Sequence, residues 1–279
     1  MITLIRIELY KIFKKWRTYI GFMVIAVIVP VINFAMLAEG EKSLDFMTRN
    51  LQQSFVFVGN LLNGYLISYF ILTSLAVHIP FLIALVAGDL LAGEATAGTY
   101  RLLITRPVAR IKIVTSKFIA GLIYSNLLVL WLAVMSLGIG ILIFGVGELI
   151  VIKSSGIIIF AKNDIIWRFI FAYGFAGLSM TVVTALAFFF SSLVENAIGP
   201  IVSTMAVIIV FLILSALPID FFRNIEPYLF TTYMSSWRNL FEDPVDYQAF
   251  IKAIAVLSLH IIILFTITAW IFKRKDILT

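Results

Sequence analysis

The chain has 279 residues, of which 62% are hydrophobic, and its mean hydropathy is +1.08. Soluble domains are roughly half apolar, so this composition excludes an ordinary soluble domain and indicates a polytopic membrane protein, while the absence of cysteine excludes disulfides and thiolate metal sites. The net charge of +6 comes from basic residues that flank apolar runs instead of lining a polar face, so we expect no nucleic-acid partner.

The first 17 residues predict an interfacial amphipathic helix. With 3.6 residues per turn, one face of this helix is apolar and consists of Ile2, Ile5, Leu9, Ile12, Phe13 and Trp16. The remaining surface carries Arg6, Glu8, Lys11, Lys14, Lys15 and Arg17. We expect residues 1–17 to lie on the cytoplasmic membrane surface, with the basic side toward anionic lipid headgroups. The alternative is a helix packed on a protein partner.

Six apolar runs follow, and each is long enough to cross a membrane, which takes about 20 mostly apolar residues. They cover approximately residues 19–37, 61–88, 118–144, 169–190, 198–217 and 253–272. Neither a flexible linker nor a soluble insertion separates them in the sequence. The pattern therefore predicts an all-α integral membrane fold with six transmembrane helices in a single transmembrane domain, residues 1–279.

Charge divides the segments outside these runs into two sets. Six spans place both termini on one side together with residues 89–117 and 191–197, and this set carries 13 basic and five acidic residues. The opposite set, residues 38–60, 145–168 and 218–252, carries eight basic and ten acidic residues. The positive-inside rule makes the first set cytoplasmic. We therefore expect a protein of the inner (cytoplasmic) membrane with both termini in the cytoplasm.

The last outer segment, residues 218–252, mixes aromatic and charged side chains. This composition favours short helices that dip into the outer membrane interface. The alternative is a docking surface for a partner protein outside the membrane.

Polar side chains within the runs offer little for catalysis or metal binding. His78 and His260 have no acid or cysteine close in sequence, so we expect packed histidines rather than metal ligands or proton carriers. No acid lies at the middle of a run, which disfavours an ion-driven carrier. Three amides are expected to bond across helices or to backbone carbonyls: Asn33, Asn63 and Asn126. Three prolines are expected to kink or start helices: Pro30, Pro80 and Pro200. The glycines of GIGILIFGVG are expected to permit close packing.

The inner segment GEATAGTYRLLITRPVARIKIVTSK, residues 93–117, is polar and basic. Gly98 gives flexibility after the second span, Thr99 is a candidate N-cap, and Pro107 disfavours helix just before it. Between them fits a helix of two turns whose apolar side is formed by Tyr100, Leu103 and Ile104. This helix has the shape to insert into a groove of a soluble partner. The alternative is a connector that rests on the membrane.

The stretch GEATAGTYRLLITRPVAR resembles the permease subunits of the type-2 ABC exporter family, whose loop between the second and third spans reads Glu, three residues, Gly-Thr, a Leu-rich turn and Pro-Val-x-Arg. The matching positions are Glu94, Gly98, Thr99, Arg101, Leu102, Leu103, Pro107 and Arg110. The interfacial helix, the six spans, the long segment before the last span and the short turn SSLVENAIGP are similar to that family in a looser way.

The resemblance implies a permease that is not itself an enzyme, dimerises and carries two ATP-binding subunits, which hold ATP and Mg. It implies a coupling helix between spans two and three, in which Tyr100 and the adjacent matched residues enter a cleft of the ATPase subunit. Arg106 and Arg110 would then lie at the rim of that cleft or on headgroups, and Glu94 would pair with a basic residue. Lys112 and Lys117 are expected to anchor the third span at the inner surface. The rival interpretation is an ion-coupled carrier or channel that works alone.

Overall fold

The computed structural model of the chain describes residues 1–52, 61–99, 108–153, 156–217 and 219–274. The longer helices are α1 (Ile2–Lys14), α2 (Arg17–Gln52), α3 (Gly64–Leu75), α4 (Ile79–Ala87), α5 (Asp89–Thr96), α7 (Arg110–Phe144), α8 (Ile166–Leu193), α9 (Ile198–Ala216) and α12 (Tyr247–Arg274). The shorter elements are β1 (Leu149–Lys153), β2 (Gly156–Phe160), η1 (Lys162–Asp164), α10 (Asp220–Ile225), η2 (Glu226–Tyr228), α11 (Phe230–Met234) and η3 (Ser236–Phe241).

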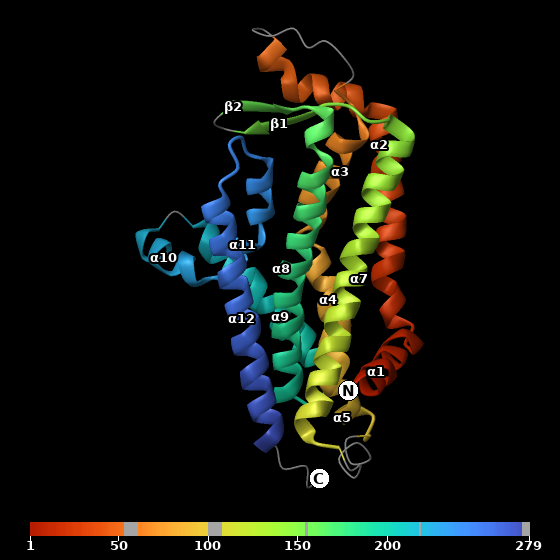
Figure 1. The fold of residues 1–279 in the computed structure, drawn as a ribbon, viewed down its shortest axis with the longest axis vertical. Helices are drawn as coiled ribbons and strands as arrows, with labels where there is room; N and C mark the ends of the chain where they lie inside the picture. The colour runs from red at the N-terminus through yellow and green to blue at the C-terminus, as the bar shows by residue number, and fades with distance from the viewer. Residues whose placement is uncertain (53–60, 100–107, 154–155, 218, 275–279) are drawn as a thin grey trace.

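The long helices form an elongated bundle (Figure 1). Within the described residues, five helices are long and apolar enough to cross a membrane, and α3 and α4 together make a sixth candidate. Helix α1 and the C-terminal end of α12 lie at the same end of the bundle (Figure 1). The prediction of an all-α integral membrane fold is confirmed, with one two-stranded hairpin as an addition to it.

A bend of 52° separates α3 from α4 within the second predicted span. Pro80 stands in the first turn of α4, where proline is tolerated because the first helical N–H groups have no intrahelical acceptor. It has no N–H to give to the carbonyl of Ala76, so a continuous helix would lack one hydrogen bond here. The expectation that Pro80 kinks or starts a helix therefore holds, and the span is divided into two short helices.

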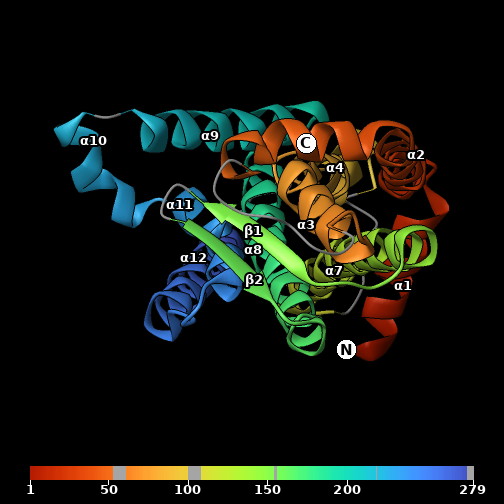
Figure 2. The ribbon, with the colours of Figure 1, turned by 90° about the horizontal axis from the view of Figure 1, so that it is seen from above.

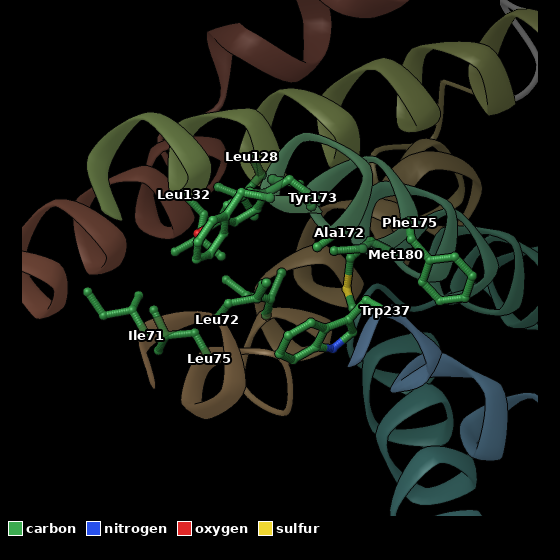
Figure 3. Packing of buried hydrophobic residues seen from close by; sticks show 14 of the residues in the cluster. Ile71, Leu72, Leu75, Leu128, Leu132, Ala172, Tyr173, Phe175, Met180 and Trp237 are labelled. Carbon is green, nitrogen blue, oxygen red and sulfur yellow. The ribbon is translucent and has the colours of Figure 1, made fainter. Parts of the chain in front are cut away.

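Helix α8 is the centre of the bundle, as the view from above shows (Figure 2). From Phe175 to Phe188 its side chains are buried on nearly all sides, which explains why this part of its sequence shows no amphipathic period. Figure 3 shows Tyr173 and Met180 of α8 among side chains of α3, α7 and η3, including Leu72, Leu132 and Trp237. The core is thus built around one helix that is apolar on every face.

Two glycines allow α3 and α7 to approach closely. A Cβ atom added at Gly64 would lie 2.5 Å from the backbone carbonyl carbon of Gly140, closer than real atoms come. The hydroxyl of Ser68 donates to the carbonyl of Gly64 at 2.7 Å and to that of Ser136 at 3.0 Å. Gly140 belongs to the run GIGILIFGVG, so its expected role in close packing is confirmed.

The outer segment 145–168 contains an antiparallel hairpin that the sequence analysis did not predict. Strands β1 and β2 pair from Leu149 with Phe160 to Lys153 with Gly156. Asn63 ties the hairpin to α3: its side-chain oxygen accepts from the first backbone N–H groups of α3, and its Nδ2 donates to the carbonyl of Glu148 at 2.7 Å. The Ile- and Val-rich runs on each side of SSG are the signal that could have indicated strands.

The last outer segment folds into short helices, as expected, but its aromatic side chains are not all directed to a membrane interface. Trp237 is 1% exposed and Phe241 is fully buried, whereas Tyr228 is 76% exposed. Arg168 of α8 holds this segment in place, donating to the carbonyls of Leu240 and Glu242. Half of the segment is therefore part of the core, because a buried guanidinium and the apolar cluster both fix it there.

Candidate functional site

Seven charged side chains from α1, α5, α7 and the start of α2 gather at one end of the bundle, where α1 lies beside α5 (Figure 1). We call this group the charge cluster, and its members are Glu8, Lys11, Lys15, Arg17, Asp89, Glu94 and Lys117. They line a cavity of about 270 Å³. The cluster includes Glu94, the first residue of the motif on which the family resemblance rests.

Lys117 is the buried centre of the charge cluster. Its side chain is 2% exposed, and its Nζ lies 2.7 Å from Glu8 Oε2 and 2.8 Å from Glu94 Oε1. An ammonium group is buried in a protein only when opposite charges and hydrogen bonds compensate for lost water. The two carboxylates supply both, so Lys117 joins α1 to α5 through α7.

Further pairs complete the attachment of α1. Lys11 Nζ lies 3.1 Å from Glu8 Oε1 and 2.8 Å from Glu94 Oε1. Lys15 Nζ lies 2.6 Å from Asp89 Oδ2, while Arg17 lies 3.6 Å from the other oxygen of Asp89. Both acids of α5 are therefore bonded to the N-terminal segment.

One expectation for these residues is wrong. Lys117 was expected to anchor the third span at the membrane surface, but it is buried and paired, because Glu8 and Glu94 reach it from two other helices. Helix α1 packs on α7 of its own chain, where Ile12 of its apolar face is buried in a hydrophobic cluster. Its basic residues Arg6 and Lys14 are exposed, and the placement of this side on lipid headgroups stays a prediction.

Gly98 and Thr99 end α5 in a defined turn. Gly98 has a φ of +67°, a conformation that only glycine adopts without strain. Its N–H donates to the carbonyl of Ala95 at 3.0 Å, and the N–H of Thr99 donates to that of Glu94 at 3.0 Å. These two bonds are the Schellman helix terminator. The structure therefore replaces the expected flexibility of Gly98 with a fixed change of chain direction.

Thr99 holds Glu94 in position from the other side. Its hydroxyl donates to the Glu94 carboxylate and lies 3.2 Å from the Glu94 carbonyl. Burial alone would raise the pKa of Glu94, but the charge of Lys117 and hydrogen bonds from Lys11, Lys117 and Thr99 outweigh it and lower this pKa to about 2. The expected pairing of Glu94 with a basic residue is thus present, with two bases instead of one.

The remaining matched positions divide between the described and undescribed residues. The expected two-turn helix lies outside the described residues, and so does any N-cap bond from Thr99 to it. The same holds for the individual positions Tyr100, Arg101, Leu102, Leu103, Arg106 and Pro107. Arg110 begins α7, and its guanidinium donates to the carbonyl of Lys273 at 3.2 Å. A cation at the C-terminal end of α12 is favourable because the helix dipole is negative there. Arg110 thus joins the inner ends of α7 and α12.

Helix α5 is also fixed to the end of α8. The hydroxyl of Ser191 accepts from the N–H groups of Leu91 and Ala92 at 3.0 and 2.8 Å, and donates to the carbonyl of Gly88 at 2.6 Å. The first backbone donors of a helix need such acceptors. Helix α5 therefore cannot move without pulling on α8, α7 and α1.

Sequence reasoning found Glu94 but missed most of its partners. Glu94 follows the second apolar run and Lys117 precedes the third, and opposite charges at the same end of neighbouring spans are the signal that could have suggested this pair. Both histidines donate from Nδ1 to the backbone carbonyl four residues earlier, His78 to Ser74 and His260 to Val256, each at 2.8 Å. No group of three potential metal ligands occurs among the described residues.

The fold and the site together define a polytopic helical membrane protein in which ion pairs join α5 to the N-terminal helix α1. The chain belongs to the ABC-2 family of transporters: the family profile, described as "ABC-2 family transporter protein", matches residues 2–277. Family membership and the long apolar helices together identify an integral membrane protein of the ABC-2 type. The chain is also similar to "Uncharacterized protein YhcI" of Bacillus subtilis (strain 168), with 29% identity over 118 residues. That alignment covers 40% of this chain and 37% of YhcI, a little over a third of the relative's length.

Proposed function

We propose that this chain is the membrane subunit of an ATP-driven exporter and that residues 94–110 couple it to the ATPase. Two copies of the chain would span the inner membrane as a homodimer, with both termini of each copy in the cytoplasm and two ATPase subunits bound beneath. ATP and Mg would be held by those subunits. The observation that carries this proposal is the bonding of Glu94 to both Lys11 and Lys117, because it connects the matched loop to three helices of the bundle.

In this proposal the loop acts as a lever. Tyr100, Arg101, Leu102 and Leu103 occupy a cleft of the ATPase, and closure of the ATPase dimer pushes the loop toward the membrane. The Schellman turn at Gly98 and the Glu94 ion pairs give the loop a fixed direction. The push passes from α5 to α7 through Lys117 and to α8 through Ser191. The spans then tilt and expose the transport path to the outside.

The test is a double substitution, Arg101→Glu with Leu103→Asp, in the full-length chain expressed with its ATPase. The changed loop carries two new negative charges, whereas the proposed cleft is complementary to an apolar and basic surface. We therefore expect at least a tenfold loss of ATPase co-purification and loss of transport. Membrane insertion should be unchanged. Lys112→Glu, an exposed position on the same side, is the matched control and should keep both activities.

Normal co-purification and transport in the double variant would contradict the coupling assignment. ATP-independent transport by the purified chain alone in liposomes would contradict the exporter proposal itself and would favour an ion-coupled carrier or channel.

A further inference from the structure

A second cavity, of about 130 Å³, lies beside the bend between α3 and α4. We call it the outer cavity. Its wall is mainly apolar, with Leu72, Val129, Leu132, Met180 and Ile208 among the lining residues; Figure 3 shows Leu72 and Met180 close to Trp237. An apolar cavity of this size holds a molecule as large as benzene. The outer cavity is therefore large enough for part of a lipid-like molecule.

The outer cavity lies beside the C-terminal half of α9 and the segment that follows it. Ile208 and Leu212 of this half line the cavity, together with Ser235 and Arg238 of the following segment. Helix α9 has 19 residues, which span about 28 Å and match the hydrocarbon core. In the topology of the proposed function, a molecule in this cavity would therefore be in contact with the outer leaflet.

Two buried hydroxyls of the outer cavity have no hydrogen-bond partner. They belong to Thr73 and Thr231, and Thr231 is 4% exposed. Threonines elsewhere in the bundle donate to the carbonyl four residues earlier, as Thr184 and Thr204 do. Leaving a buried hydroxyl unpaired costs about 1–3 kcal/mol, so both positions point to an acceptor that a bound molecule supplies.

A cation lies at the opening of the outer cavity. Arg238 is exposed and makes no ion pair with any described residue, and its guanidinium lies 5.6 Å from the ring centre of Trp237. Val77, which is 54% exposed, also lines the cavity. The cavity thus presents an apolar wall, two free hydroxyl donors and one positive charge at its mouth.

We propose that the outer cavity binds a single-chain anionic amphiphile, with the chemistry of a long-chain fatty acid, taken from the outer leaflet. The oxygens of its acidic head accept from Thr73 and Thr231, and Arg238 balances its charge. The first carbons of its chain lie against Leu72 and Met180, and the rest of the chain continues into the lipid. This site shares no residue with the coupling loop, and its occupation needs no ATPase.

The test uses the full-length chain, without ATPase, in phosphatidylcholine nanodiscs at pH 8, where a fatty acid is ionised. The probe is a palmitate that carries a photoactivatable diazirine on its chain. We expect saturable labelling that maps to peptides around residues 72–80 and 129–132. Unlabelled palmitate should displace the probe at least tenfold more effectively than its methyl ester, which lacks the charge.

Variants separate the parts of the site. Arg238→Gln should weaken binding of the acid at least fivefold and leave the ester unchanged, and Arg238→Lys should restore most of the affinity. Ala76→Phe fills the cavity and should abolish labelling by both, while the matched change Ala255→Phe, on an exposed face of α12, should have no effect. Thr231→Val removes an unpaired hydroxyl, so it should raise the unfolding temperature of the ligand-free protein and lower its affinity for palmitate.

Three results would overturn the proposal. These are labelling that Ala76→Phe does not reduce, equal affinity of the wild type and Arg238→Gln for palmitate, and displacement by phosphatidylglycerol as effective as that by palmitate. If Ala76→Phe fails to fold, the Arg238 and Thr231 variants decide, because each keeps the volume of the apolar wall. Loss of coupling in the loop variants would leave all of these results unchanged, so the two proposals fail separately.

Discussion

At the scale of single residues, Lys117 shows why a basic side chain next to an apolar run is ambiguous in the sequence. The same lysine could anchor a span at headgroups or enter the protein, and the choice depends on partners that lie far away in the chain. Glu8 is 109 residues from Lys117, and Glu94 is 23 residues from it. Local sequence predicted that Glu94 needs a base, but only the packing of α1 on α7 selects Lys117 and Lys11.

We expect Lys117→Met to destabilise the protein by about 3–5 kcal/mol, because removal of one partner leaves buried carboxylates without compensation. The double change Glu8→Gln with Lys117→Met should recover part of this loss, since one of the two stranded charges is removed. Lys112→Met, at an exposed position five residues earlier, should change stability by less than about 0.5 kcal/mol. Thermal unfolding in detergent measures all three. Equal midpoints for Lys117→Met and Lys112→Met would show that Lys117 is only a surface anchor.

Gly98 gives a second prediction at this scale. A Cβ atom there meets nothing within 4 Å, so the cost of Gly98→Ala is conformational alone, about 1–2 kcal/mol for a left-handed residue. Gly98→Asn should cost less, because asparagine tolerates this region. Gly138→Ala in α7, where a Cβ also meets nothing, should instead be neutral or stabilising. We expect the unfolding midpoint to be highest for Gly138→Ala, lower for Gly98→Asn and lowest for Gly98→Ala. The reverse order would mean that Gly98 does not terminate α5.

At the scale of elements, the sequence predicted helices well and their attachments poorly. Apolar length and proline positions indicated the long helices and the division of α3 from α4. The period of α1 gave its amphipathic character, and Ile12 of its apolar face does pack against the protein, but Glu8 is buried through ion pairs that no local pattern records. The hairpin β1–β2 was missed for a related reason: its pairing is anchored by Asn63, 85 residues before the carbonyl it bonds.

The attachment of α1 should depend on pH through Glu94. Its pKa is about 2 in the folded protein against an ordinary value of 4.5, so the ionised carboxylate stabilises the attached state. This contribution is complete above about pH 4.5 and is lost as the pH falls from there to about 2. Since the chain has no cysteine, spin labels at Tyr10→Cys and Ile111→Cys, both exposed, can report the distance between α1 and α7.

We expect a narrow distance distribution at pH 7 that broadens between pH 4.5 and 2. In Glu94→Gln the distribution should already be broader at pH 7 and should change less on acidification. A distribution that stays narrow through pH 2 in the unmodified cluster would mean that the Glu94 pairs do not hold α1.

At the scale of the whole molecule, hydropathy and charge together were sufficient to predict the fold class. They were not sufficient to predict which helix lies at the centre of the bundle. The composition required a membrane protein, and six apolar runs required a helical bundle. That α8 lies at the centre could not be predicted, because every span is apolar and the central one differs in the larger share of its side chains that is buried. The candidate site was half predictable: the motif marked the loop from Glu94 to Thr99, and the tertiary fold supplied α1 and Lys117.

The number of crossings gives the last prediction, since it depends on whether the bent pair α3–α4 spans the membrane or turns back. With six crossings, α1 and the end of α8 lie on the same side, as they do in the bundle of Figure 1, and α10–η2 lies on the opposite side. Five crossings, with α3–α4 re-entrant, would place α1 on the side of α10.

Single cysteines at Tyr10, Glu195 and Tyr228, all exposed, distinguish these cases when a membrane-impermeant maleimide is added to sealed vesicles of known orientation. We expect Tyr10→Cys and Glu195→Cys to react only from the cytoplasmic face and Tyr228→Cys only from the other. Reaction of Tyr10→Cys and Tyr228→Cys from one face would show that α3–α4 is a re-entrant loop and that the charge cluster does not face the ATPase.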